Sequence, residues 1–191
     1  MKFEELPYIG DRKVYREELF KHVSNDNLIA EFGVATGRSA IHWLQMMSAD
    51  STLYCFDSWE GLPEDWHINP GKTLAKGAFR GAVPAPLIDD ERCTIVKGWF
   101  EDTLPYDFPA QLGLLHIDCD LYSACKTVLD HVDPYIGNGT VIVFDEIWDS
   151  GKYPFWEQHE YKAYREWIEL TGKSVDWLLA TDGGAMGIVK A

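Results

Sequence analysis

Acidic side chains recur at the ends of short apolar runs in this chain of 191 residues. Asp57, Asp118 and Asp145 each end such a run, Glu146 follows directly, and Glu31 lies inside the first run. Carboxylates gathered at one place raise one another's pKa values unless cations or hydrogen-bond donors lie among them. The pattern therefore predicts a site for a ligand that carries donors or positive charge, with or without a metal ion. The plainer interpretation, that aspartate ends strands and caps helices, covers one or two of these acids.

A loop with two glycines follows the first apolar run and leads into a segment of helical periodicity. It reads Glu31-Phe-Gly-Val-Ala-Thr-Gly-Arg-Ser39, which places Gly33 and Gly37 four residues apart. Gly33 permits a tight turn, and Gly37 permits a ligand to approach the amino end of the helix. The spacing differs from the Gly-x-Gly-x-x-Gly of dinucleotide sites. A structural turn explains the loop equally well, but together with Asp57, placed as a ribose-binding acid, the loop favours an adenosine cofactor.

Short apolar runs alternate with helical segments, which is the pattern of a parallel sheet with helices on both faces. The expected strands are residues 27–33, 52–57, 93–97, 112–118 and 140–145, and the expected helices are 38–48, 121–132 and 156–170. Two further strand-like runs, 175–181 and 185–189, are joined by a short Asp-Gly link that permits only a tight hairpin. We therefore predict a single α/β domain over residues 1–191, with a Rossmann-like, doubly wound, mostly parallel seven-stranded sheet and an antiparallel C-terminal hairpin.

In such sheets ligands bind beyond the carboxyl ends of the strands, so the acids should meet at one edge. A long connection, residues 60–90, is rich in glycine and proline and has room for at most a short helix within 73–79. A loop of this length is usually functional or disordered, and we expect a lid or mobile loop. Its basic side chains Lys72, Lys76 and Arg80 form either a solvated face or a grip on an anionic acceptor.

The composition excludes several classes of protein. There are 31 acidic and 17 basic residues, which gives a net charge of −14 and disfavours binding to nucleic acid. No apolar stretch approaches the roughly 20 residues of a membrane helix, and the first residues lack the features of a signal peptide. The four cysteines, Cys55, Cys93, Cys119 and Cys125, do not have the spacing of a zinc ribbon. We expect a cytoplasmic protein with reduced cysteines.

The glycine loop, Asp57 and the reversed last strand together resemble a class I S-adenosylmethionine-dependent methyltransferase. Four blocks, at 56–63, 98–105, 116–122 and 143–146, are similar in sequence and order to the macrocin O-methyltransferase family. That family includes metal-dependent sugar O-methyltransferases of antibiotic biosynthesis. The antibiotic enzymes carry a longer segment before the first strand than residues 1–27 of this chain.

The resemblance implies which residues hold the cofactor, S-adenosylmethionine. Its methionine part would be held by Glu31, Gly33, Gly37 and Ser39. Its ribose would be held by Asp57 with Ser58, and its adenine would lie near Trp99 and Phe100.

The resemblance also implies a divalent cation, expected to be Mg²⁺, bound by Asp118, Asp145 and Glu146. Glu146 stands where the family usually has a second metal-binding aspartate. Asp118 or Asp120 would lie nearest the acceptor hydroxyl and accept its proton, although a helix cap before Leu121 explains Asp120 equally well. His116, inside an apolar strand, is expected to be a hydrogen-bonded core residue.

These observations predict an S-adenosylmethionine-dependent O-methyltransferase with divalent metal assistance. Its substrate would be a hydroxyl of a small molecule, with a sugar or sugar-containing metabolite as the acceptor that the family suggests. The family also suggests a homodimer. Two alternatives stay open: a nicotinamide-dependent oxidoreductase, which the glycine spacing disfavours, and a cofactor- or metal-binding module without turnover.

Overall fold

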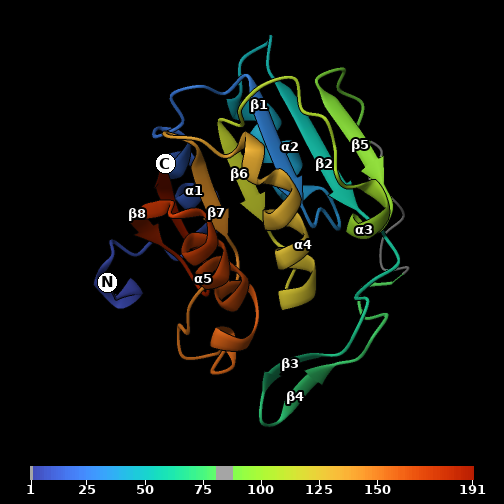
Figure 1. Cartoon of the computed structure of the whole chain (residues 1–191), viewed down its shortest axis with the longest axis vertical. Helices are drawn as coiled ribbons and strands as arrows, with labels where there is room; N and C mark the ends of the chain where they lie inside the picture. The colour runs from blue at the N-terminus through green and yellow to red at the C-terminus, as the bar shows by residue number, and fades with distance from the viewer. Residues whose placement is uncertain (1, 81–87) are drawn as a thin grey trace.

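A seven-stranded sheet forms the centre of the protein, as predicted (Figure 1). The computed structural model describes residues 2–80 and 88–191. Across the sheet the order is β5 (Cys93–Lys97), β2 (Thr52–Asp57), β1 (Leu28–Phe32), β6 (Leu114–Ile117), β7 (Val141–Phe144), β9 (Ala185–Lys190) and β8 (Ser174–Ala180). All pairs are parallel except those of β9, which runs antiparallel to both β7 and β8. The strand order reverses between β1 and β6, so ligand-binding loops are expected to part there.

Helices cover both faces of this sheet. Figure 1 shows α4 (Tyr122–Val132) and α5 (Glu160–Thr171) in front of it, with α1 (Arg12–Phe20) and α2 (Arg38–Met46) behind. The remaining helical elements are short: α3 (Phe100–Thr103) and the 3₁₀ turns η1 (Phe3–Glu5), η2 (Asp133–Tyr135) and η3 (Trp156–Gln158). Every residue of β1, β6 and β7 is buried, as expected for strands covered on both faces.

The region around residues 60–90 differs from the prediction. Instead of a short helix within 73–79, the chain forms a hairpin of β3 (Trp66–Asn69) and β4 (Lys72–Leu74). Pro70 and Gly71 favour the tight turn between them, because proline and glycine are both typical residues of β-turns. Figure 1 shows this hairpin standing away from the main sheet. Residues 81–87 lie outside the described part, so the lid stays a prediction.

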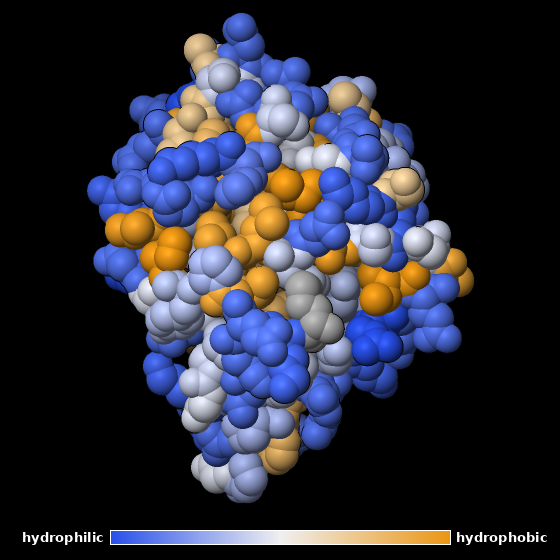
Figure 2. All heavy atoms as spheres, turned by 90° about the vertical axis from the view of Figure 1, so that its left-hand side faces the viewer, coloured by the Kyte–Doolittle hydropathy of each residue, from blue (hydrophilic) through white to orange (hydrophobic). Residues whose placement is uncertain are grey.

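The surface carries scattered apolar side chains. Tyr8, Val14 and Leu170 are among the exposed large hydrophobic residues. Figure 2 shows hydrophobic patches between hydrophilic residues on the face that it presents. Among the described residues, no helix combines the length and apolar character needed to cross a bilayer. The homodimer that the family suggests is not tested by this structure and stays a prediction.

Gly33 joins the end of β1 to the end of β6 at very close range. Its φ is +89°, and a Cβ built on it would lie 1.7 Å from the carbonyl oxygen of Asp118. The Gly33 amide also donates to the carbonyl of Phe56, 2.9 Å away. Any side chain at this position would push apart the two loops that flank the switch in strand order.

Gly33→Ala should therefore destabilise the protein far more than Gly139→Ala, its matched control. Gly139 has a φ of +92° but open space around it, so both variants pay about 1–2 kcal/mol for a left-handed alanine. Only Gly33→Ala adds a backbone clash, for a total loss of about 3–5 kcal/mol. Urea unfolding of the two variants measures the difference, and equal losses would show that the close approach is unimportant.

Candidate cofactor and cation site

A cavity of about 350 Å³ opens at the carboxyl ends of β1, β2, β5 and β6. It lies where the strand order reverses, which is where this class of sheet binds ligands. Of the predicted cofactor residues, those that line the cavity are Gly33, Asp57, Ser58, Trp99 and Phe100. The two predicted catalytic residues, Asp118 and Asp120, line it as well. The structure thus brings the glycine loop and the acids after β6 to one cavity.

Asp57 holds the glycine loop in place. Its Oδ2 accepts hydrogen bonds from the amides of Val34 and Ala35, both at 2.9 Å, and its Oδ1 accepts one from Trp59 at 2.7 Å. A carboxylate has about four acceptor positions, so about one is left for a ligand hydroxyl. Asp57 therefore shapes the loop in addition to the ribose contact that the sequence predicts for it.

Glu31, Gly37 and Ser39 lie behind the cavity, outside the lining that the structure describes. Glu31 is fully buried, and its Oε1 accepts a hydrogen bond from the Ser39 hydroxyl. Gly37 precedes α2 with a φ of +76°. These buried residues support the glycine loop from the protein interior, and their contact with a cofactor stays a prediction.

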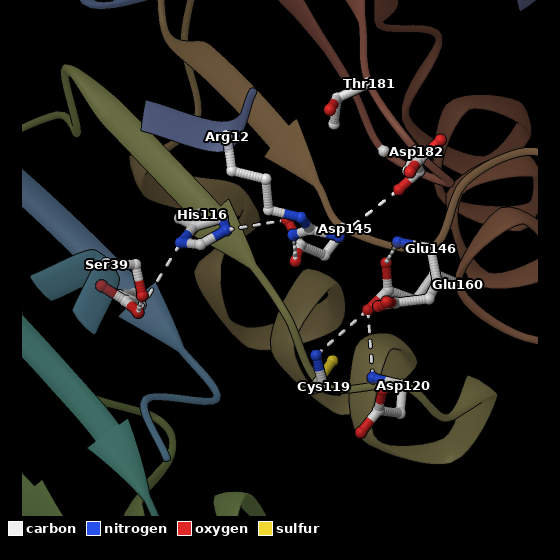
Figure 3. A network of polar contacts seen from close by, with 12 residues as sticks. Arg12, Ser39, His116, Cys119, Asp120, Asp145, Glu146, Glu160, Thr181 and Asp182 are labelled. Atoms are coloured by element: carbon white, nitrogen blue, oxygen red, sulfur yellow. Dashed lines mark hydrogen bonds and ion pairs between the residues drawn. The ribbon is translucent and has the colours of Figure 1, made fainter. Parts of the chain in front are cut away.

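A second buried network connects Glu31 to Asp145 through His116, and Figure 3 shows the contact between His116 and Asp145. His116 Nδ1 lies 3.7 Å from Glu31 Oε1, and His116 Nε2 lies 3.4 Å from Asp145 Oδ1. On the far side of Asp145, Arg12 donates through Nη1 to Oδ2 and through Nη2 to the carbonyl of Asp182 at 3.3 Å. His116 is thus a hydrogen-bonded core residue, as expected, and Arg12 is a site residue that the sequence analysis missed.

Charges of opposite sign compensate one another around His116 and Asp145. Burial alone would lower the pKa of His116, but the hydrogen bonds and charges of Asp145 and Glu31 raise it to about 10. Burial alone would raise the pKa of Asp145, yet His116 and Arg12 hold it well below its usual range. At neutral pH the ionised Asp145 therefore lies between two cations, His116 and Arg12.

Three other carboxylates, those of Asp118, Asp120 and Glu146, form a second group with ligand atoms within 4.8 Å of one another. Burial raises the pKa of all three, and neighbouring negative charges raise it further. Within the described part of the chain no lysine, arginine or histidine forms an ion pair with them, and the buried Oε2 of Glu146 has no hydrogen-bond partner. Such an oxygen-only set fits a hard divalent cation.

Glu160, the second residue that the sequence analysis missed, holds this acidic group together. It is fully buried, and its Oε1 accepts from the amides of Cys119 at 3.1 Å and Asp120 at 3.2 Å. Its Oε2 accepts from the amide of Glu146 at 3.1 Å (Figure 3). The start of α5 thereby fixes the loops after β6 and β7 relative to each other.

These contacts change two expectations, one about the metal ligands and one about Asp120. The predicted metal set divides, because Asp118 groups with His116 and Asp145 on one side and with Asp120 and Glu146 on the other. The capping interpretation of Asp120 is wrong, since Leu121 is the residue before α4 and no side chain caps that helix.

The raised pKa of His116 should make stability depend on pH above its ordinary value of 6.5. The folded state holds the proton more tightly than the unfolded state, so this contribution is complete below pH 6.5 and disappears as the pH rises towards 10. Urea unfolding should show wild type losing stability relative to His116→Gln over this range. His22→Gln, at an exposed position, should follow wild type; parallel curves for His116→Gln would contradict the network.

The chain is similar in sequence to known methyltransferases. A family model described as a methyltransferase domain matches residues 30–147. The tetracenomycin relative, 8-demethyl-8-(2,3-dimethoxy-alpha-L-rhamnosyl)-tetracenomycin-C 4'-O-methyltransferase of Streptomyces olivaceus, is 26% identical over 136 residues, covering 62% of this chain and 52% of the relative. Mycinamicin III 3''-O-methyltransferase of Micromonospora griseorubida is 27% identical over 140 residues, covering 62% and 54%. The chain spans about half the length of the curated relatives it matches.

Solved structures share the fold at low sequence identity. The calicheamicin methyltransferase CalS11 has a TM-score of 0.68 at 20% identity, over 92% of this chain and 77% of its own. The O-methyltransferase NovP has a TM-score of 0.66 at 17% identity, over 92% and 79%. The matched segment contains the glycine loop, Asp57 and the acids from Asp118 to Glu146. The chain therefore belongs to the methyltransferase domain family, among the class I S-adenosylmethionine-dependent methyltransferases of the macrocin-like O-methyltransferase kind.

Proposed function

We propose that this protein transfers a methyl group from S-adenosylmethionine to a hydroxyl of a small molecule, in particular a sugar or sugar-containing metabolite. One observation carries the proposal: a single cavity is lined by the glycine loop and Asp57 on one side and by Asp118 and Asp120 on the other. A nucleoside cofactor and an acceptor hydroxyl could thus meet at the ends of β1 and β6.

The cavity residues fit the cofactor. Its volume of about 350 Å³ falls within the usual range for small-ligand sites. Asp57 keeps about one acceptor position for a ribose hydroxyl, and Trp99 and Phe100 offer aromatic faces to an adenine. The carboxylates of Asp118 and Asp120 favour a positively charged group in the same cavity.

When bound, S-adenosylmethionine supplies an already activated methyl group, so the chain mainly has to provide proximity and alignment. The cavity walls would orient the acceptor hydroxyl towards that methyl group. Asp120 or Asp118 would accept the proton that this hydroxyl loses. Burial and neighbouring carboxylates raise the pKa values of both acids, and a cation beside them would lower these pKa values and so favour the ionised, basic form.

The cation in this proposal is a divalent ion, with Mg²⁺ favoured by the oxygen-only ligand set. Asp118, Asp120 and Glu146 would hold it, supported by the partnerless oxygen of Glu146. Such an ion lowers the pKa of a hydroxyl bound to it, which assists an unactivated alcohol.

The sugar acceptor is supported by the names of relatives. The tetracenomycin relative's name contains a rhamnosyl group, and a second structure of CalS11 is described as a TDP-rhamnose 3'-O-methyltransferase. We extend this acceptor class to the present chain as part of the proposal.

Binding of S-adenosylhomocysteine provides the first test. At 100 times its Kd it should add about 2.7 kcal/mol to the stability of wild type, whereas NADH should add nothing. Trp99→Ala should weaken binding about tenfold or more, because stacking on a base contributes roughly 1–3 kcal/mol. The matched control is Trp156→Ala, a partly buried tryptophan outside the cavity lining. Stabilisation by NADH alone would favour the oxidoreductase. No response to either ligand would indicate that the glycine loop is only a structural turn.

Catalysis by Asp120 is tested separately. Asp120→Asn should lower kcat about 100-fold or more, the usual contribution of a general base, with little change in the affinity for S-adenosylhomocysteine. Formation of S-adenosylhomocysteine with a panel of sugars and sugar nucleotides measures turnover. Full activity of Asp120→Asn would leave Asp118 as the base and would also contradict Asp120 as a ligand of the cation. Binding without transfer to any acceptor would favour the module without turnover.

A further inference from the structure

The acids at this edge of the sheet belong to two groups that differ in how their charges are compensated. Asp145 has both oxygens engaged, Oδ1 by His116 at 3.4 Å and Oδ2 by Arg12. In the other group, Glu146 has a buried oxygen that finds no hydrogen-bond partner within the described part of the chain. Among the described residues no donor reaches the side-chain oxygens of Asp118 or Asp120.

Arg12 is placed by its own helix. It is the first residue of α1, and the side chain of Asp11 caps that helix by accepting from the amides of Lys13 and Val14, both at 2.9 Å. Tyr15 on the same helix is buried against the sheet. The helix lies outside the family-matched residues 30–147.

The guanidinium of Arg12 is firmly held. Its two terminal nitrogens bind different partners, Asp145 and the carbonyl of Asp182 (Figure 3). The Arg12 side chain is 40% exposed and that of Asp145 only 9%, so the pair is shielded on the aspartate side. A guanidinium stays charged at any ordinary pH, so Asp145 always has a cation beside it.

We propose that Arg12 is the resident cation of Asp145, and that the divalent ion is bound by Asp118, Asp120 and Glu146 without Asp145. The inference rests on the cation in the proposed function. Asp118, Asp145 and His116 also have ligand atoms within 4.8 Å of one another, so geometry alone would admit an ion beside Asp145. Arg12 closes that position by charge repulsion and by occupying Oδ2, and so directs the ion to the open group.

Removal of Arg12 should therefore strengthen metal binding. In Arg12→Gln, Asp145 loses its cation and its oxygen becomes available beside Asp118. We expect Mn²⁺, measured by calorimetric titration and by electron paramagnetic resonance of the free ion, to bind about tenfold more tightly than to wild type. Lys13→Gln removes one exposed positive charge from the same helix and should bind Mn²⁺ about as wild type does.

Two double variants, each with the net charge of wild type, then test whether Asp145 binds the ion or only lies near it. Arg12→Gln/Asp145→Asn removes the whole ion pair with no change in net charge, and it should bind Mn²⁺ about as tightly as wild type. Lys13→Gln/Glu146→Gln also keeps the net charge but removes a proposed ligand, so it should lose about tenfold or more in affinity. Thermal unfolding of each variant confirms that it is folded.

The outcomes are distinct. An equal loss of Mn²⁺ affinity in the two double variants would make Asp145 a metal ligand and overturn the inference while leaving the metal proposal intact. Absence of Mn²⁺ binding in every variant, including Arg12→Gln, would overturn both, although S-adenosylhomocysteine binding would stand. Should the Arg12→Gln/Asp145→Asn variant fail to fold, Arg12→Gln alone decides: tighter binding supports the inference, and unchanged or weaker binding overturns it.

Discussion

Mutual repulsion among buried carboxylates is the constraint on which this structure depends. Asp118, Asp120, Asp145, Glu146 and Glu160 meet at one edge of the sheet, and burial raises the pKa of each unless something compensates it. The chain compensates one part of the cluster with its own cations and leaves another part uncompensated. Two acids of the uncompensated part, Asp118 and Asp120, line the cavity where a charged cofactor, a metal ion and an acceptor would converge. The negative charge that the chain itself does not compensate therefore lies at the proposed reaction site.

The fold provides the compensation from distant segments. Arg12 reaches Asp145 from α1 behind the sheet, and Glu160 reaches the loops after β6 and β7 from the start of α5 in front of it. Three backbone amides converge on Glu160, but burial still keeps its pKa raised, to about 7. The packing of α1 and α5 against the sheet and the assembly of the acidic cluster at its edge therefore depend on the same contacts.

The sequence predicts the sheet well because its information is local. Each buried strand is a short apolar run, and the link 182–184 forces the last two strands to pair. The β3–β4 hairpin was not predicted because pairing with residues 66–69, rather than local helical preference, decides the conformation of residues 72–74.

The candidate site, too, could be predicted only where the information is local. Crowded carboxylates predict that cations or donors must be present, but sequence alone cannot show that Arg12 is one of them, since 133 positions separate it from Asp145.

A crystal structure with S-adenosylhomocysteine and Mn²⁺, with anomalous difference maps at the manganese edge, tests the central claim most directly. The account predicts S-adenosylhomocysteine in the cavity between Asp57 and Trp99, and a single manganese peak bonded to Asp118, Asp120 and Glu146. Arg12 should still be bound to Asp145 in that complex. A manganese ion bonded to Asp145 with Arg12 displaced, or S-adenosylhomocysteine bound outside the cavity, would contradict the account.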